Sequence, residues 1–240
     1  MTKSVERGGG PTRRMFLKLS AAAGLVLGLP GTALALFKKR FPVRTVEADD
    51  FRFDPATGMV RYDGRGEEPY RLVIDGLVKK PVSLTYPDLK SLPRTEQVSD
   101  FHCVEGWSVA DTRWGGFRFQ EVLNRVEPAA EARYAVFHSL GQTRHKPKGQ
   151  TRYIESLPVA RLTDPKAECL LVLDRDGEPL THDHGAPLRL ISPFDLAYKG
   201  AKYVTRIELA AKPRPGWWTL ANPIYPIDAP VPAYRLRGER

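Results

Sequence analysis

The stretch CLLVLDRDGEPLTHDHGAPLRLI, residues 169–191, contains the clearest strand signals in the chain. It opens with an apolar run from Cys169 to Leu173, which is typical of a buried strand. The turn sequence Asp-Arg-Asp-Gly follows at 174–177, and a second apolar run covers 187–191. This part of the chain therefore predicts two strands that are joined through a turn and a polar loop.

Further strands and short helices extend from this segment toward both ends of the chain. Strands are predicted at 70–74, 95–103, 134–140 and 202–209, and short helices at 85–92, 119–126 and 157–162. Thr85 suits an N-cap, and Pro87 falls in the first turn of its helix. Because strands dominate, we predict an α+β fold, mainly β, with a single domain over residues 69–211.

The segments on either side of this domain differ from it in composition. Residues 36–68 are polar and rich in Asp and Gly, which predicts an N-terminal arm that wraps the later core. Residues 212–240 contain six prolines, too many for regular structure. We expect this C-terminal tail to lie along the domain, with Trp217 and Trp218 as packing anchors.

The N-terminal residues carry the pattern of an export signal. Residues 12–18, Thr-Arg-Arg-Met-Phe-Leu-Lys, place paired arginines before an uncharged apolar run at 19–37, which is typical of the twin-arginine pathway. The sequence Ala33-Leu34-Ala35 is a small-x-small cleavage site, so we expect residues 1–35 to be removed and the mature chain to be periplasmic. An uncleaved membrane anchor is the alternative, since a spanning helix needs about 20 apolar residues. The twin-arginine export machinery carries folded proteins, which favours a cofactor inserted before transport.

The composition of the chain restricts its chemistry. It has 240 residues, with 37 Lys and Arg against 28 Asp and Glu, and these are globular proportions. The basic residues form no stripe interleaved with aromatics, so nucleic acid is not an expected partner. Two cysteines and no C-x-x-C-H motif exclude a covalently attached haem and an iron–sulfur cluster. Any electrons must come from a partner protein.

The segment Phe-His-Cys-Val-Glu-Gly-Trp at 101–107 places Cys103 where a predicted strand ends. A thiolate there can act as a nucleophile or as a soft metal ligand. Two other readings remain open, a buried structural cysteine and a disulfide with Cys169.

A second cluster covers residues 182–189 and 198–202. It gathers His182, His184, Arg189 and Lys202 among small residues that allow close approach to a ligand. Guanidinium, ammonium and backbone N–H groups bind phosphate, so the cluster predicts an anion site. Ordinary turns with solvated lysines, or a zinc site at the two histidines, are the alternatives.

In this order, the motifs resemble the sulfite oxidase-type molybdopterin oxidoreductases. The similar stretches are Leu-Val-Ile-Asp-Gly-Leu-Val at 72–78, Cys-Val-Glu-x-Trp-Ser at 103–108, Trp-x-Gly-Phe at 114–117, His-Gly-Ala-Pro-Leu-Arg at 184–189 and Tyr-Lys-Gly-Ala-Lys at 198–202. The Cys103 segment is most similar to the periplasmic methionine sulfoxide reductase catalytic subunits, although no clear match to their upstream cofactor contacts appears at 48–53.

The resemblance implies a role for each matching residue. It makes Cys103 the single protein ligand of molybdenum. It implies that the pterin and its phosphate are held by Ser139, His184, Arg189, Gly200, Ala201 and Lys202. It also implies a two-electron oxygen-atom transfer or reduction of a small S-oxide, with electrons exchanged with a membrane b-type haem subunit or a periplasmic cytochrome. Glu105 is a candidate proton donor if it is partly buried; its alternative is a surface carboxylate.

Two other hypotheses belong to different classes. The first is an exported, non-enzymatic anion-binding module with a disulfide between Cys103 and Cys169. The second is a zinc hydrolase that uses His182, His184 and Cys103. The length and order of the resemblance favour the molybdenum enzyme.

Overall fold

Residues 169–173, where the sequence predicts a strand, correspond to β10 (Leu170–Arg175) of an antiparallel sheet in the computed structural model, which describes residues 46–236. The export signal that we predict at 1–35 lies outside the described residues. The strands are β1 (Phe51–Asp54), β2 (Met59–Tyr62), β3 (Gly66–Pro69), β4 (Arg71–Gly76), β5 (Val82–Thr85), β6 (Thr95–His102), β7 (Ser108–Phe117), β8 (Tyr134–Ser139), β9 (Ile154–Pro158), β10 (Leu170–Arg175), β11 (Glu178–Pro179), β12 (Arg189–Ile191) and β13 (Val204–Ala210). The α-helices are α3 (Tyr86–Lys90), α4 (Phe119–Leu123), α5 (Val159–Thr163) and α6 (Trp217–Ala221). The α+β, mainly β, fold class is therefore confirmed.

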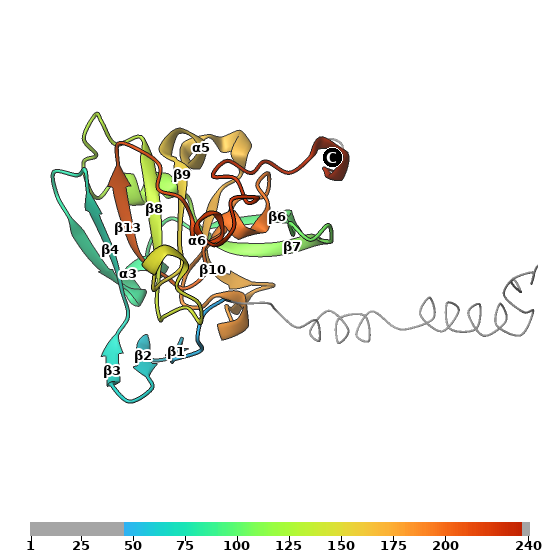
Figure 1. The fold of residues 1–240 in the computed structure, drawn as a ribbon. Coiled ribbons are helices and arrows are strands. Elements are labelled where there is room, and N and C mark those ends of the chain that lie inside the picture. Colours follow the sequence, from blue (N-terminus) through green and yellow to red (C-terminus); the bar gives the residue numbers. More distant parts are fainter. Residues whose placement is uncertain (1–45, 237–240) are drawn as a thin grey trace, which may run out of the picture. The chain divides into compact units, whose positions relative to one another are not determined.

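Two five-stranded sheets and one small meander make up the described residues. The first large sheet has the order β11-β10-β7-β6. The strand β12 also pairs with β10, on the edge opposite β7 and beside β11. The second has the order β5-β4-β13-β8-β9, in which β13 is parallel to β4 and antiparallel to β8 (Figure 1). Side chains from both sheets, such as Leu171 and Phe137, share one hydrophobic core.

The long hairpin of β6 and β7 is the element that presents Cys103. Its register runs from Thr95 opposite Gly116 to His102 opposite Ser108. The turn at its tip closes through two backbone hydrogen bonds, from the Cys103 N–H to the Trp107 carbonyl (2.9 Å) and from the Gly106 N–H to the Cys103 carbonyl (3.2 Å). Cys103 therefore lies just past the end of β6, as the sequence predicts.

Seven of the thirteen strands within residues 46–236 were not predicted from the sequence: β1, β2, β3, β5, β7, β9 and β11. Two of them, β7 and β9, lie in the large sheets beside predicted elements. The residues of β7 include two glycines, which normally weaken a strand. Gly116 is required here because a Cβ at this position would collide with the Leu171 backbone of the paired strand β10. The strand β9 occupies residues that directly precede the predicted helix, which begins two residues later than expected, at Val159.

The helix near residue 85 follows the prediction closely. Thr85 accepts a hydrogen bond from the Asp88 N–H, and the Asp88 carboxylate accepts one from the Thr85 N–H, which completes a capping box. Within the described part of the chain, no helix is both long and apolar enough to cross a membrane.

The arm and the tail both contain regular structure. The strands β1, β2 and β3 of the arm form an antiparallel meander. The proline-rich tail contains α6, where the buried Trp217 donates its indole N–H to Thr143 (3.1 Å). The turn signals of the arm therefore correspond to the turns between its strands. The tail contains a helix, unlike the prediction from its proline content, because its prolines lie on either side of Trp217–Ala221 and none within it.

Candidate functional site

Arg189 of β12 is the most buried cation of the candidate site. Its side chain is 5% exposed, and its Nη1 donates to the His184 carbonyl (3.0 Å). The guanidinium lies over two aromatic rings, with its Cζ 5.5 Å from the Phe101 centroid and 5.4 Å from the Trp114 centroid. Burial, together with the nearby charge of Arg175, lowers the pKa of Arg189 to about 10. The side chain remains a cation at neutral pH.

His184 is held as a neutral imidazole. Arg175 of β10 donates to its Nε2 (2.6 Å), so the proton is assigned to Nδ1, which lies 2.7 Å from the Thr181 hydroxyl. Burial and the charges of Arg175 and Arg189 lower the pKa of His184 to about 4. The ring therefore orients Arg175 and adds no charge at neutral pH.

Lys202 and Ser139 join this cluster from the neighbouring sheet. The Ser139 hydroxyl, at the end of β8, donates to the Lys202 carbonyl (2.6 Å), which sets the position of the lysine. Gly185 has φ +99°, and a Cβ on it would lie 2.8 Å from Lys202 Cγ, so only glycine fits there. Burial, together with the charge of Arg189, lowers the pKa of Lys202 to about 8.

Gly200 and Ala201 place their backbone against β12. The Ala201 carbonyl accepts a hydrogen bond from the Leu190 N–H (2.8 Å), and a Cβ on Gly200 would lie 2.8 Å from the Leu190 carbonyl oxygen. The structure thus brings Ser139, His184, Arg189 and the 200–202 segment together, as the sequence predicts.

The cations Arg175, Arg189 and Lys202 lie close together around His184, where partial burial strengthens the repulsion between their charges. No carboxylate forms an ion pair with Arg189 among residues 46–236, and four buried nitrogens in this region find no hydrogen-bond partner there: Arg175 Nε, Arg189 Nε, Trp114 Nε1 and His182 Nδ1. Buried donors are normally satisfied, so this arrangement suits an anionic ligand that supplies acceptors.

The arm contributes to the site through Phe51. Its ring meets the rings of His182 and Tyr203, each with a centroid distance of 5.1 Å. His182 Nε2 also lies 2.9 Å from an Asp49 carboxylate oxygen. Arg52 instead bonds Asp49 at the surface. The sequence placed His182 in the predicted anion cluster, with a zinc site as the alternative, and did not identify Arg175 or Asp49, whose proximity depends on tertiary contacts.

Cys103 and Glu105 lie at the tip of the β6–β7 hairpin. Cys103 is half-buried, and Phe101, two residues before it, connects the hairpin to Arg189. Glu105 is exposed and accepts a hydrogen bond from the Trp107 indole N–H (3.3 Å). Glu105 is therefore the surface carboxylate of the two alternatives, with its carboxyl group open to bulk water.

Both competing hypotheses fail on geometry. Cys103 and Cys169 are not bonded to each other. Gln97 donates a hydrogen bond to the carbonyl of Glu168, the residue before Cys169. Gln97 precedes Cys103 by six residues of strand β6, which is about 20 Å at roughly 3.4 Å per residue. A disulfide needs Cα atoms within about 7 Å of each other. Residues 46–236 also contain no group of three His, Cys, Asp or Glu side chains that could hold a metal, so His182, His184 and Cys103 form no zinc site.

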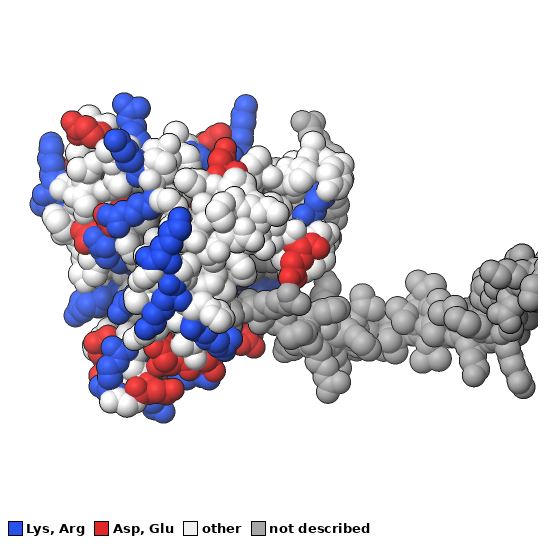
Figure 2. All heavy atoms as spheres, viewed as in Figure 1, with Lys and Arg blue, Asp and Glu red and all other residues white. Residues whose placement is uncertain are grey.

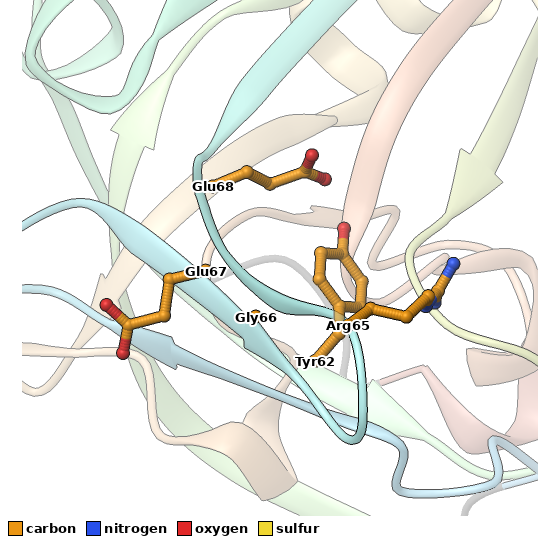
Figure 3. A pocket seen from close by; sticks show the side chains of 5 residues that line it. All are labelled: Tyr62, Arg65, Gly66, Glu67 and Glu68. Atoms are coloured by element: carbon orange, nitrogen blue, oxygen red, sulfur yellow. The ribbon is translucent and has the colours of Figure 1, made fainter.

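A pocket on the arm is separate from this cluster. Tyr62, Arg65, Gly66, Glu67 and Glu68 line it, and none of them is a predicted site residue. Figure 3 shows Glu68 extending toward the Tyr62 hydroxyl while Glu67 points the opposite way. Burial and a hydrogen bond with Glu68 raise the pKa of Tyr62 to about 12. The pocket is formed by one turn of the meander.

Comparison with known families identifies the domain. The oxidoreductase molybdopterin binding domain matches residues 59–218, about two thirds of the chain. The chain belongs to this family.

Relatives of the molybdopterin domain include two curated proteins. The protein-methionine-sulfoxide reductase catalytic subunit MsrP of Ralstonia nicotianae is 34% identical over 225 residues, which cover 88% of this chain and 66% of that protein. The oxidoreductase YuiH of Bacillus subtilis is 34% identical over 161 residues, which cover 64% of this chain and 75% of that protein. The chain therefore spans about two thirds to three quarters of these relatives.

A solved structure shares the fold of the molybdopterin domain. The sulfane dehydrogenase SoxCD from Paracoccus pantotrophus superposes with a TM-score of 0.53 at 21% identity, over 72% of this chain and 49% of that chain. At this identity the similarity concerns the fold alone.

Membership of the molybdopterin family implies molybdenum-molybdopterin as the cofactor, and the residues present fit it. The pterin phosphate needs cationic donors, which buried Arg189 and half-buried Lys202 supply beside the small residues Gly185 and Gly200. Molybdenum is a soft-metal centre in this cofactor and suits a thiolate, which Cys103 offers at the hairpin tip. The N–H groups at Arg189 Nε and Trp114 Nε1 have no acceptor among the described residues, and acceptor atoms of the cofactor could bond them.

Proposed function

We propose that this chain is the catalytic part of an exported molybdenum oxidoreductase that reduces a small S-oxide similar to methionine sulfoxide. The observation that carries the proposal is the cation cluster of buried Arg189 with half-buried Arg175 and Lys202, which the Cys103 hairpin meets at Phe101. Similarity to the methionine sulfoxide reductase subunit supports the choice of substrate class.

In this proposal Cys103 is the protein's ligand to molybdenum, and the cluster holds the pterin. Arg189 offers a planar donor fork to the phosphate, and Lys202 offers a compact charge beside it. Ser139, Gly200 and Ala201 fix the backbone of the lysine segment, while His184 holds Arg175 in place. These residues bind and orient the cofactor and exchange no proton with substrate.

When bound, molybdenum supplies the two-electron redox chemistry and the site of oxygen-atom exchange. The net reaction is R₂SO + 2e⁻ + 2H⁺ → R₂S + H₂O, so two protons must reach the site for each turnover. We assign part of this delivery to Glu105, which is exposed to bulk water two residues after Cys103. Its carboxylate is held at the hairpin tip by the Trp107 indole N–H.

The electrons are proposed to come from a separate haem protein, a membrane b-type subunit or a periplasmic cytochrome. The chain has two cysteines and no C-x-x-C-H motif, so it offers no site for a covalently attached haem or an iron–sulfur cluster. In this proposal the electrons therefore come from another protein. Lys and Arg outnumber Asp and Glu on the face seen in Figure 2, whereas acidic side chains gather at its lower end, over the β1–β3 meander. Such a face attracts an acidic partner. The predicted twin-arginine signal supports a periplasmic location.

Purification of the mature protein from a host that makes the molybdenum cofactor tests the proposal. We expect about one molybdenum and one pterin per chain, and oxidation of a reduced dye that depends on methionine sulfoxide or another S-oxide. A parallel assay with sulfite and an oxidising dye distinguishes oxidation from reduction. Molybdenum without S-oxide reduction would refute the substrate class, and protein without molybdenum would refute the enzyme.

A matched pair of variants tests the proton donor. Glu105→Gln removes a carboxylate at the hairpin tip, whereas Glu67→Gln removes an exposed carboxylate of the arm. We expect only the first to lower kcat for S-oxide reduction. Equal activity of both variants would remove Glu105 from the mechanism.

A further inference from the structure

The C-terminal tail returns to the site and reaches the turn that carries Cys103. Val231 donates a backbone hydrogen bond to the Phe194 carbonyl (2.9 Å), and Pro230 forms a β-bridge with Asp195, so the tail is fastened to the domain before its last residues. A 3₁₀ turn at Ala233–Arg235 follows. The side chain of Arg235 then extends to the tip of the β6–β7 hairpin.

Arg235 bonds both sides of that tip. Its Nη1 donates to the Cys103 carbonyl (2.8 Å), and its Nη2 donates to the Trp107 carbonyl (2.8 Å) and to the Ser108 hydroxyl (3.1 Å). The same two carbonyls accept the backbone hydrogen bonds that close the turn. One guanidinium therefore ties together the residues at which the chain enters and leaves the turn.

Other contacts at the base of the turn lie on its strand side: His102 Nδ1 is 2.8 Å from the Ser108 hydroxyl oxygen, and the ring centroids of Phe101 and Trp107 are 6.0 Å apart. The strand ladder ends at the pair of His102 and Ser108, every residue from Val104 to Ser108 is exposed, and Gly106 adopts φ +95°, so packing contributes little to the backbone of the turn. The side chain of Trp107 is 49% exposed. Hydrogen bonds at the base of the turn must therefore set the direction in which Cys103 presents its sulfur.

We infer that Arg235 is the positioning residue for the Cys103 thiolate. The inference rests on the proposed function, because it takes Cys103 as the ligand of molybdenum. The planar fork of arginine reaches the two carbonyls through two separate nitrogens, whereas a lysine at this position would offer one nitrogen to both. Loss of the fork leaves Cys103 present but free to move, which weakens or redirects its bond to the metal.

Three variants of the full-length protein test this role. Arg235→Gln removes the charged fork, Arg235→Lys keeps the charge alone, and Arg113→Gln is the control, since Arg113 is an exposed arginine of the same hairpin. The measurements are amide hydrogen exchange of residues 103–108, molybdenum content, the thiolate-to-molybdenum absorption band, and kcat and KM for S-oxide reduction.

We expect Arg235→Gln to accelerate exchange in the turn about tenfold, as the loss of hydrogen bonds of ordinary strength predicts. The absorption band should shift, and kcat should fall about tenfold through a misplaced ligand, with KM and molybdenum content within about twofold of the wild type. For Arg235→Lys, the exchange rate, the shift of the absorption band and kcat should each lie between those of the wild type and Arg235→Gln. Arg113→Gln should match the wild type in all three.

Two results would overturn the inference. One is wild-type exchange and an unshifted band in Arg235→Gln. The other is exchange that rises equally in β8 and β13, which would show an effect on global stability and not on the turn. Wild-type protein without molybdenum would instead refute the proposed function and the ligand role with it, while the exchange comparison would still decide whether Arg235 holds the turn.

Discussion

The guanidinium of Arg189 lies over the indole ring of Trp114, with its Cζ 5.4 Å from the ring centroid. Both side chains are buried, and each keeps one N–H, on Arg189 Nε and Trp114 Nε1, that no group among residues 46–236 accepts. An aromatic face attracts a cation without using its hydrogen-bond donors, as a carboxylate would. This relationship keeps the donors of Arg189 available for an anionic ligand.

Replacement of Arg189 separates cofactor binding from folding. We expect Arg189→Met to lower molybdenum and pterin content strongly, because a charge-assisted phosphate contact is lost. The cofactor-free variant should unfold about 2–4 °C above the cofactor-free wild type, because relief of a buried, unpaired charge outweighs one lost hydrogen bond by about 1 kcal/mol. Metal analysis and thermal unfolding measure the two effects. Full cofactor content would place the anion site elsewhere.

The charge of Lys202 makes anion binding dependent on pH. Its pKa is lowered to about 8 by burial and by the charge of Arg189. Below this pH the lysine is charged and attracts an anion, and as the pH rises through about 8 it becomes neutral. Sulfate, whose charge is constant over this range, should therefore raise the Tm of the cofactor-free protein more at pH 6.5 than at pH 9.5.

Two lysine variants check this assignment. Lys202→Gln should remove most of the pH dependence of the sulfate effect, whereas the exposed control Lys212→Gln should retain it. A sulfate effect that does not change with pH in the wild type would contradict the role of Lys202.

The two cysteines should differ sharply in their effect on catalysis. Cys103→Ser is expected to lower S-oxide reduction by at least about a hundredfold, since losing a metal ligand costs more than the roughly 10–100-fold that losing a supporting residue costs. Cys169 is buried beside the Ser192 hydroxyl (3.4 Å), and burial raises the pKa of its thiol. Cys169→Ala should leave kcat within about twofold of the wild type. Steady-state assays at equal molybdenum content decide between these outcomes.

Lys199 forms a buried ion pair with Glu155 of β9 and also bonds the tail. Lys199 bonds the buried Glu155 carboxylate and the carbonyls of Ser156 and Ile227, and both charged side chains are almost fully buried. Lys199→Met should lower the free energy of unfolding by about 3–5 kcal/mol, because it leaves the buried Glu155 carboxylate without a cation beside it. Urea unfolding of the cofactor-free protein measures this loss.

The same experiment includes its own controls. The double variant Glu155→Met/Lys199→Met should recover most of the lost stability, because no charge remains unpaired. Arg61→Met, which breaks the exposed pair with Glu67, should change stability by at most about 1 kcal/mol. A single variant at Lys199 as stable as the wild type would show that the pair contributes little.

Local chemistry accounts for the features that the sequence predicted well. The capping box at Thr85 depends on a residue three positions away, and the strand before Asp174 depends on a contiguous apolar run. The cationic residues at 184–189 and 198–202 lie in two short segments, so their charge was visible before their contacts were known. The strand β7 was missed because its glycines are favourable only against the backbone of β10.

The sequence by itself determined the mainly β class, the cysteine at a strand end and the two cationic segments, because each depends on neighbouring residues. Only the tertiary structure decided that Arg175 holds His184, that Phe51 of the arm packs on His182, and that Arg235 bonds the carbonyl of a residue 132 positions earlier. These contacts depend on strand register and on the path of the tail. Both are set by the packing of the whole core, and no local pattern encodes them.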